Sequence, residues 1–418
     1  MKKIGNYRWR ICGLLFAATT INYINRQTIG ILAPELHNVF EWTEKDYGYI
    51  IMSFQIAYAL GLLLSGRFLD KFGVKIGFTL AMGIWSLATG LHALCSTVIG
   101  FSAARFGLAI GQSANFPAAI KTVSEWFPKK ERAFATGVFN AGSTIGAIIA
   151  PIVVLWLAIQ WDWKWAFIIT GSLGFLWLLL WLPFYRPPRE IKDLSEGELE
   201  HIESDNEPEV KVSIPWVKLL TYKQTIGICL GRFLTDPIWW FFLYWLPKYL
   251  SSEHSIDLQA LGLPLIIIYA VSSMGGIGGG WLSSQFIKSG RSIDFARKTS
   301  ILIVALMVVP VFFLSYFSNL WIAVALISLA TAAHQGWASN IFTVVSDIYP
   351  KKVVGSMTGL AGFAGAVGGV LFAPLVGFIL DATQSYYIVF AIASCAYLLA
   401  WLSLKIFIPR IEPIVVSE

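Results

Sequence analysis

Two arginines stand inside long apolar stretches of this sequence, with no acidic residue close to either in the same stretch. Arg26 follows Asn22 and Tyr23 by about one helical turn, and Arg105 precedes Gln112 by about two. A guanidinium offers two parallel hydrogen bonds to a carboxylate and stays charged in a dry cavity. The two arginines are therefore candidate ligands of a carboxylate, and the alternative is a buried structural charge.

A third arginine, Arg232, precedes Asp236 by four positions in another apolar stretch. At this spacing the two side chains share one face of a helix and can neutralise each other, which favours a structural pair over contact with a ligand. Asp236 and His334 are nevertheless candidates to take up and release a proton. The alternative for His334 is an ordinary core histidine.

The elements that carry these residues are apolar segments. The chain has 418 residues, of which 56% are hydrophobic and 13% charged, and its mean hydropathy is +0.66, whereas soluble domains have about 25% charged residues. Repeated segments are as long as the ~20 residues that cross a bilayer as a helix. The sequence therefore predicts an all-α membrane protein with twelve transmembrane helices. The predicted spans are about 11–34, 47–66, 76–96, 98–120, 133–160, 165–185, 224–247, 258–287, 299–317, 320–346, 353–380 and 384–404.

The second half of the chain repeats the first. The segment Ser-Glu-Trp-Phe-Pro-Lys-Lys at 124–130 returns as Ser-Asp-Ile-Tyr-Pro-Lys-Lys at 346–352, which indicates duplication of half the protein. We expect two pseudo-symmetric six-helix bundles, 1–185 and 223–418, with a substrate site between them that is exposed to each side in turn. A cytoplasmic linker, 186–222, joins the bundles in this prediction.

Charge sets the orientation of the spans. Basic residues such as Arg8, Lys129 and Lys351 fall on one side, and the opposite loops are acidic, so the positive-inside rule places both termini in the cytoplasm. We expect a multi-pass membrane protein, whose net charge of +6 needs no nucleic-acid partner. The linker segment 193–199 predicts a short surface helix with an acidic first turn.

Neutral polar residues extend the candidate site. Asn140, Ser143 and Thr144 form a polar helical stripe, whereas their counterparts in the second half are Gly362, Gly365 and Ala366, so packing alone does not require polar groups there. The alternative is that the hydroxyls bond their own helix. Amides can bond sugar hydroxyls while aromatic rings stack on a pyranose. The other polar or aromatic candidates are Gln55, Tyr58, His334, Gln335, Trp337 and Asn340.

The ten residues 66–75, Gly-Arg-Phe-Leu-Asp-Lys-Phe-Gly-Val-Lys, resemble the signature loop of the major facilitator superfamily. Its glycines permit a tight turn, and its acid can engage bases or a helix N-terminus. The resemblance implies a gating role for this loop. Glu125 and Asp347, at cytoplasmic helix ends beside lysines, suit the same gate. The gating candidates are Gly66, Asp70, Gly73, Lys75, Glu125 and Asp347.

A closer resemblance covers nearly the whole chain. Arg26 after Asn22-Tyr23, the segment 117–132, and the segment 334–343 (His-Gln-Gly-Trp-Ala-Ser-Asn-Ile-Phe-Thr) resemble the anion:cation symporter family, and within it the bacterial hexuronate transporters. This resemblance implies a secondary transporter that takes up galacturonate or glucuronate with protons across a bacterial inner (plasma) membrane. It does not imply an enzyme. We expect no cofactor and no metal, and a monomer whose partners are a sugar acid and the bilayer.

One departure from that family concerns coupling. Related proton-coupled members carry an acid just before the first-helix arginine and another in the fourth helix, where this chain has Asn25 and Gln112. Neither amide titrates near neutral pH. Coupling then falls to Asp236 and His334, or the protein is a facilitator of an aldonate or another organic anion, or couples to another cation. A membrane sensor that does not transport is the remaining alternative.

Overall fold

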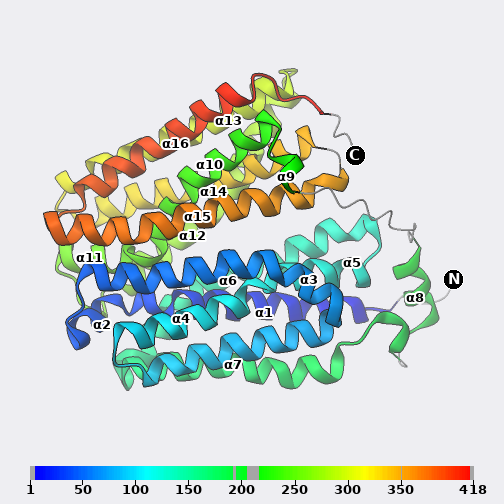
Figure 1. Cartoon of the computed structure of the whole chain (residues 1–418), viewed down its shortest axis with the longest axis horizontal. Helices are drawn as coiled ribbons and strands as arrows, with labels where there is room; N and C mark the ends of the chain where they lie inside the picture. Colours follow the sequence, from blue (N-terminus) through cyan, green and yellow to red (C-terminus); the bar gives the residue numbers. More distant parts are fainter. Residues whose placement is uncertain (1–4, 192–193, 205–215, 350, 415–418) are drawn as a thin grey trace. The chain divides into compact units, whose positions relative to one another are not determined.

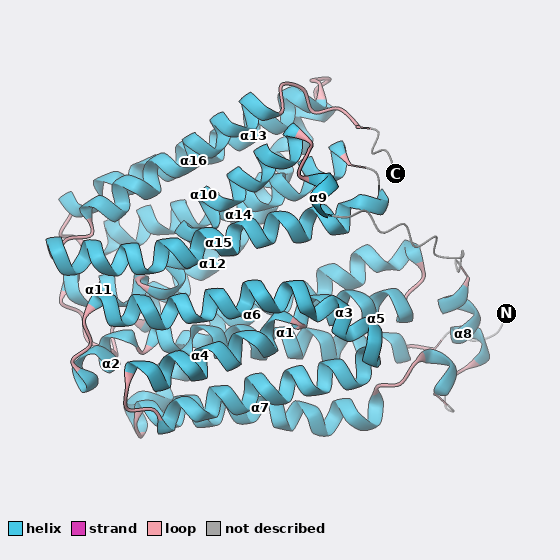
Figure 2. Ribbon diagram, in the orientation of Figure 1, coloured by secondary structure: helices cyan, strands magenta, loops and turns pink. Residues whose placement is uncertain are grey.

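The computed structural model describes residues 5–191, 194–204, 216–349 and 351–414. Within these ranges the chain is helical with no strand (Figure 2), which confirms the predicted fold class. The α-helices of the first half are α1 Tyr7–Ile31, α2 Ala33–Phe40, α3 Glu44–Leu91, α4 Val98–Ser113, α5 Asn115–Trp126, α6 Lys129–Gln160, α7 Trp163–Phe184 and α8 Glu196–Glu203. Those of the second half are α9 Trp216–Leu219, α10 Lys223–Tyr244, α11 Leu246–His254, α12 Gly262–Lys288, α13 Ile293–Val308, α14 Leu320–Ile348, α15 Lys351–Thr383 and α16 Tyr387–Phe407 (Figure 1).

Ten helical segments of the described residues are long and apolar enough to cross a membrane, and each matches a predicted span. The other two predicted spans correspond to α1 and to α4 with α5. Helix α1 is continuous, but polar residues around Arg26 interrupt its apolar sequence, and α4 and α5 are separated at Ala114. Helix α3 holds two spans because its backbone turns at Gly73, where φ is 77°. That conformation favours glycine, so the sequence places glycine where the loop 66–75 must bend.

Local capping explains where several helices start. The Thr97 hydroxyl accepts a hydrogen bond from the Gly100 amide at the start of α4 (3.1 Å). The Asn319 side chain accepts one from the Trp321 amide at the start of α14 (2.9 Å). These caps lie between the predicted spans 76–96 and 98–120 and between 299–317 and 320–346, where side-chain oxygens satisfy amides that no helical carbonyl can reach. Ser195 caps α8, the short linker helix that the sequence predicts.

The helices form two units of packed residues. The first unit consists of Met1–Ile29 and Ile56–Lys211, and the second of Gly30–Gln55 and Val212–Glu418. Residues 30–55, from the end of α1 to the first turns of α3, therefore pack with helices of the second half. The boundaries expected from the repeat, 1–185, 186–222 and 223–418, stay a prediction.

Helix α8 is held in the first unit by buried charges. The Arg8 guanidinium donates to Glu131 through Nε (2.9 Å) and to Glu198 of α8 through Nη1 (3.2 Å). His201 of α8 bonds the second oxygen of Glu131 through Nε2 (2.8 Å). Burial raises the pKa of Glu131, but the bonds and charges of Arg8 and His201 outweigh it and bring this pKa below its ordinary value. The cluster thus fixes α8 to the starts of α1 and α6.

In the second unit, α2 and the start of α3 are bound to α11 and α15. The backbone amides of Glu44 and Lys45 donate to the two carboxylate oxygens of Asp381 (2.8 and 3.1 Å). The Lys248 ammonium pairs with the Glu44 carboxylate and also contacts His37. Burial, and then the Lys248 charge, lower the pKa of His37 to about 3. This imidazole is therefore neutral at ordinary pH.

Glycines bring backbones into contact in the same unit. A Cβ at Gly30 would lie 2.8 Å from the carbonyl oxygen of Leu243 in α10. A Cβ at Gly279 of α12 would lie 2.4 Å from the Cα of Gly336 in α14. Glycines of the run 275–280 therefore let α12 and α14 pack closely.

We expect Gly279→Ala to destabilise the protein and Gly278→Ala to leave it unchanged. The added methyl at Gly279 meets backbone that cannot move aside, whereas a Cβ at Gly278 meets nothing within 4 Å. Overpacking of this kind costs about 1–3 kcal/mol. Thermal unfolding of the detergent-solubilised variants measures the difference, and equal midpoints would contradict the close contact of α12 and α14.

Candidate functional site

Arg26 is a buried charge near the end of α1, with 3% of its surface exposed. Its Nε donates a hydrogen bond to Oε1 of Gln112 on α4 (3.0 Å), and its Nη2 donates to Oδ1 of Asn22, one turn back on α1 (3.2 Å). Both acceptors are amide oxygens, which orient a guanidinium without cancelling its charge. The structure thus brings Arg26 and Gln112 into contact, whereas the sequence offers them as two separate candidate site residues.

Two tyrosine rings complete the surroundings of this guanidinium. Its carbon lies 5.0 Å from the centre of the Tyr23 ring and 4.8 Å from that of the Tyr58 ring, which comes from α3. Ring faces attract a cation and are apolar enough to reduce its hydration. Arg26, Tyr23, Tyr58 and Gln112 therefore form one group, which we call the Arg26 cluster.

A network between α1 and α4 fixes the position of Gln112. Its Nε2 donates to the Asn22 backbone carbonyl (2.9 Å), while its Oε1 receives the Arg26 bond. Just beyond the break at Ala114, Asn115 donates to the Thr19 hydroxyl (3.3 Å). Gln112 therefore has its donor and its acceptor engaged at once, so the arginine is presented in one orientation.

Arg105 contacts the backbone of Arg26 from helix α4. Its side chain is 0% exposed, and its Nη1 donates to the backbone carbonyl of Arg26 (3.3 Å). This geometry places the Arg105 guanidinium against the helix that carries Arg26. This contact fits a role for Arg105 in positioning α1 better than the direct binding of a carboxylate that the sequence suggests. Direct binding by Arg105 stays an untested prediction.

The polar stripe of α6 lies beside α1. A Cβ at Gly146 would meet the Cβ of Tyr23 at 2.9 Å, so the two helices touch at the Arg26 cluster. Asn140 is exposed, and the Ser143 hydroxyl donates to the Asn140 carbonyl (2.7 Å). Ser143 thus bonds its own helix, which agrees with the alternative that the hydroxyls of this stripe bond their own backbone.

In the second unit, Arg232 and Asp236 of α10 form the expected ion pair. The Arg232 Nη2 lies 2.8 Å from an Asp236 oxygen, and the guanidinium carbon lies 5.1 Å from the centre of the Phe342 ring. A Cβ at Gly365 of α15 would overlap this carboxylate, so α15 approaches α10 closely here. The pair fits the structural interpretation of the sequence.

His334 of α14 has partners on two neighbouring helices. Its Nδ1 lies 2.7 Å from the Tyr397 hydroxyl, and its ring stacks on Trp239 with 5.0 Å between centres. Trp337 is 0% exposed and packs edge-on against Tyr397. Both residues are therefore packed into the second unit, and Trp337 offers no open face to a sugar ring.

The remaining candidates of α14 and α3 are separate from His334. Asn340 donates to the Gly279 and Gly336 carbonyls (3.0 and 2.9 Å), which ties α14 to α12. Gln335 is partly exposed beside Gly276. Gln55 is 0% exposed, and its amide has no hydrogen-bond partner among the described residues. It packs in the second unit, whereas Tyr58, one turn further along α3, belongs to the first.

The gating candidates lie in the loop 66–75 and at the ends of α5 and α14. Gly66 is exposed and Lys75 partly exposed, while the Asp70 side chain lies outside the described residues. Glu125 accepts a hydrogen bond from the Tyr185 hydroxyl (2.7 Å), and burial raises its pKa. Asp347 accepts from Arg297 Nε (2.8 Å).

Arg297 also donates to the Ser283 hydroxyl through Nη1 (2.7 Å). Contacts of this kind show which helix ends are tied together within a unit. They do not test gating, which stays a prediction.

Sequence reasoning missed two groups of residues. Asn22 could have been included, because it precedes Arg26 by four positions and therefore shares its face. Tyr397 and Trp239 gave no signal, since aromatic residues in a membrane helix usually only pack. Their relation to His334 depends on contacts between helices that are distant in the sequence.

Comparison with known proteins agrees with this architecture. The family model of the Major Facilitator Superfamily matches residues 15–371. A hexuronate transporter of Escherichia coli K12 is 32% identical over 386 residues, which cover 91% of this chain and 89% of the relative. A D-galactonate transporter of Escherichia coli O6:H1 is 29% identical over 389 residues, which cover 90% of each chain.

Solved structures agree on the fold. The D-xylose-proton symporter superposes with a TM-score of 0.76 at 17% identity, over 96% of this chain and 98% of the other. The helices, the spans and the match of the family model over most of the sequence agree. The chain therefore belongs to the Major Facilitator Superfamily.

Proposed function

We propose that this chain imports a hexuronate, such as galacturonate or glucuronate, across a bacterial inner membrane by alternating access. The observation that supports it best is the geometry of Arg26, a buried guanidinium oriented by two amide oxygens and two aromatic rings. A charge near the bilayer centre costs about 2.5 kcal/mol or more. The carboxylate of a sugar acid offsets this cost through paired, charge-assisted hydrogen bonds.

Each part of the Arg26 cluster has a task in this proposal. Arg26 binds the substrate carboxylate, and Gln112 keeps the guanidinium in the plane that a carboxylate needs. Tyr58 and Tyr23 shield the ion pair from water and offer hydroxyls to the sugar. Arg105 is a positioning residue, because its contact is with the backbone that carries Arg26. The hexuronate transporter at 32% identity supports this class of substrate.

Proton coupling is the second part of the proposal. Gln112 and Asn25 cannot carry the proton, so Asp236 and His334 are the groups that we assign to coupling. Asp236 can give up its ion pair with Arg232 and take up a proton instead. His334 can take up a proton on its ring, which is hydrogen-bonded to the Tyr397 hydroxyl. The alternative is a facilitator of an aldonate, which the D-galactonate transporter among the relatives supports.

Counterflow in proteoliposomes tests the substrate class. Vesicles loaded with unlabelled galacturonate should accumulate labelled galacturonate, and glucuronate inside should support the same exchange. Exchange with galactonate alone would favour the aldonate alternative. No exchange with any sugar acid, by protein that is folded by its thermal midpoint, would contradict transport and favour a sensor.

A pH gradient tests coupling in the same vesicles. An inward proton gradient should drive uptake above equilibrium, and a protonophore should abolish the excess. Asp236→Asn should keep counterflow but lose the response to the gradient. An unchanged response would remove Asp236 from the coupling mechanism.

A further inference from the structure

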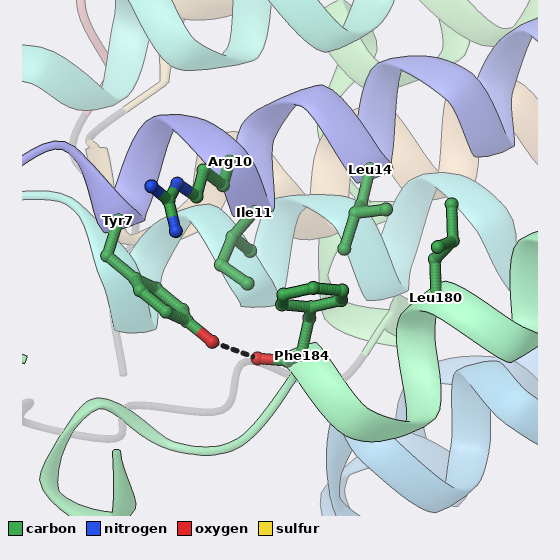
Figure 3. A pocket seen from close by; sticks show the side chains of 6 residues that line it. All are labelled: Tyr7, Arg10, Ile11, Leu14, Leu180 and Phe184. Atoms are coloured by element: carbon green, nitrogen blue, oxygen red, sulfur yellow. Dashed lines mark hydrogen bonds between the residues drawn. The ribbon is translucent and has the colours of Figure 1, made fainter. Parts of the chain in front are cut away.

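A groove on the first unit lies between the start of α1 and the end of α7, outside the Arg26 cluster. Its volume is about 160 Å³, roughly five times the share of one water molecule in the liquid. Figure 3 shows the side chains of Ile11 and Leu14 facing α7, with the Phe184 ring between these two, and with the Tyr7 hydroxyl directed at the Phe184 carbonyl. The lining residues are Tyr7, Arg10, Ile11, Leu14, Leu180 and Phe184.

The wall of this groove is apolar. Leu180 and Phe184 are 50% and 43% exposed, and the Tyr7 hydroxyl is turned to the Phe184 backbone carbonyl, to which it donates (2.7 Å). A ligand within the groove therefore meets hydrocarbon and an aromatic face. On a helix pair that spans a bilayer, the matching partner is an acyl chain rather than a sugar.

Positive charge stands at one end of the groove. Arg10 is exposed, with its guanidinium over the Tyr7 ring at 5.9 Å, and in the described part of the chain it forms no ion pair. Arg186, two residues after Phe184, is exposed as well. The positive-inside rule assigns this end to the cytoplasmic surface, where a tyrosine lies at headgroup depth and anionic lipids gather.

We propose that this groove binds one anionic phospholipid of the cytoplasmic leaflet. The acyl chain lies against Leu14, Leu180 and Phe184, and the phosphate accepts hydrogen bonds from Arg10, with Arg186 adding attraction. The apolar wall matches the acyl chain, and the positive charge matches the phosphate. A neutral lipid would match only the wall.

Native mass spectrometry of the full-length protein, with phosphatidylglycerol or phosphatidylcholine of the same acyl chains, tests the proposal. The first phosphatidylglycerol should bind more tightly than phosphatidylcholine, and Arg10→Gln should weaken it about fivefold, the effect of one arginine near the surface. Arg410→Gln removes the same charge from an exposed arginine of the second unit and should change nothing. Inorganic phosphate should not compete, because the acyl chain is part of the recognition.

Filling the groove provides the second variant. Leu180→Trp should weaken both lipids, whereas Leu179→Trp, at a neighbouring exposed position that does not line the groove, should weaken neither. Equal affinity for the two lipids, or phosphatidylglycerol binding that Arg10→Gln leaves intact, would overturn the proposal. Dimers that persist without lipid and disappear with Leu180→Trp would instead assign the groove to a second copy of the chain.

Discussion

Arg26→Lys is expected to lower counterflow of labelled galacturonate roughly 100-fold, which corresponds to about 2.7 kcal/mol and lies within the range of one hydrogen bond to a charged group. Lysine keeps the positive charge but offers a single point donor in place of the planar fork, so it cannot make two parallel bonds to a carboxylate. It also loses the bonds to Gln112 and Asn22 that orient the guanidinium. Initial rates at several substrate concentrations measure the change.

The matched control is Arg291→Lys, at an exposed arginine in the loop before α13. Its rate should equal that of the wild type. A thermal midpoint of Arg26→Lys close to that of the wild type shows that the lost activity does not come from unfolding. Uptake that stays within about threefold of the wild type would refute Arg26 as the carboxylate ligand. So small a change corresponds to less free energy than the ~1.5 kcal/mol of one charged hydrogen bond.

Arg8→Met is expected to destabilise the first unit by about 3 kcal/mol. The Glu198 side chain is 2% exposed and is paired with Arg8 (3.2 Å), so the substitution leaves a buried carboxylate with its charge unmatched. Methionine keeps much of the buried volume, which isolates the loss of charge. Thermal unfolding followed by tryptophan fluorescence, with proteolysis of the linker as a second measure, detects the release of α8.

Adding Glu198→Gln to Arg8→Met should recover part of the lost stability, since the second change removes the unmatched charge. Arg410→Met, at an arginine that is 80% exposed, should have no effect. Because the pKa of Glu131 lies below its ordinary 4.5 in the folded protein, its contribution is present above pH 4.5 and lost as the pH falls through the folded value. A cluster that is equally stable at neutral and strongly acidic pH would contradict the role of Glu131.

Features encoded by neighbouring residues could be predicted from the sequence. The caps Thr97, Asn319 and Ser195 act on amides within three residues, and the glycine run 275–280 packs against α14 as its composition suggests. Each depends on residue type and spacing alone. The ion pair of Arg232 and Asp236 was predictable for the same reason.

Relations between helices could not be predicted with the same detail. Helical spacing places Arg26 and Gln112 on faces of their own helices, but it does not say that these faces meet. Arg105 looks like a second carboxylate ligand in the sequence, and only its contact with the Arg26 carbonyl indicates a positioning role. The packing of residues 30–55 with the second half was equally hidden, because these residues are continuous in sequence with the first half.

Helix α1 carries both the proposed ligand of the carboxylate and a close packing contact. Arg26 precedes Gly30 by four residues, so about one helical turn of 5.4 Å separates it from the glycine that touches α10. If Arg26 binds the substrate carboxylate, as proposed, a displacement of the arginine by the anion reaches the Gly30 contact with Leu243 along the helix axis. We therefore expect a bulky residue at Gly30 to alter substrate affinity without touching the substrate.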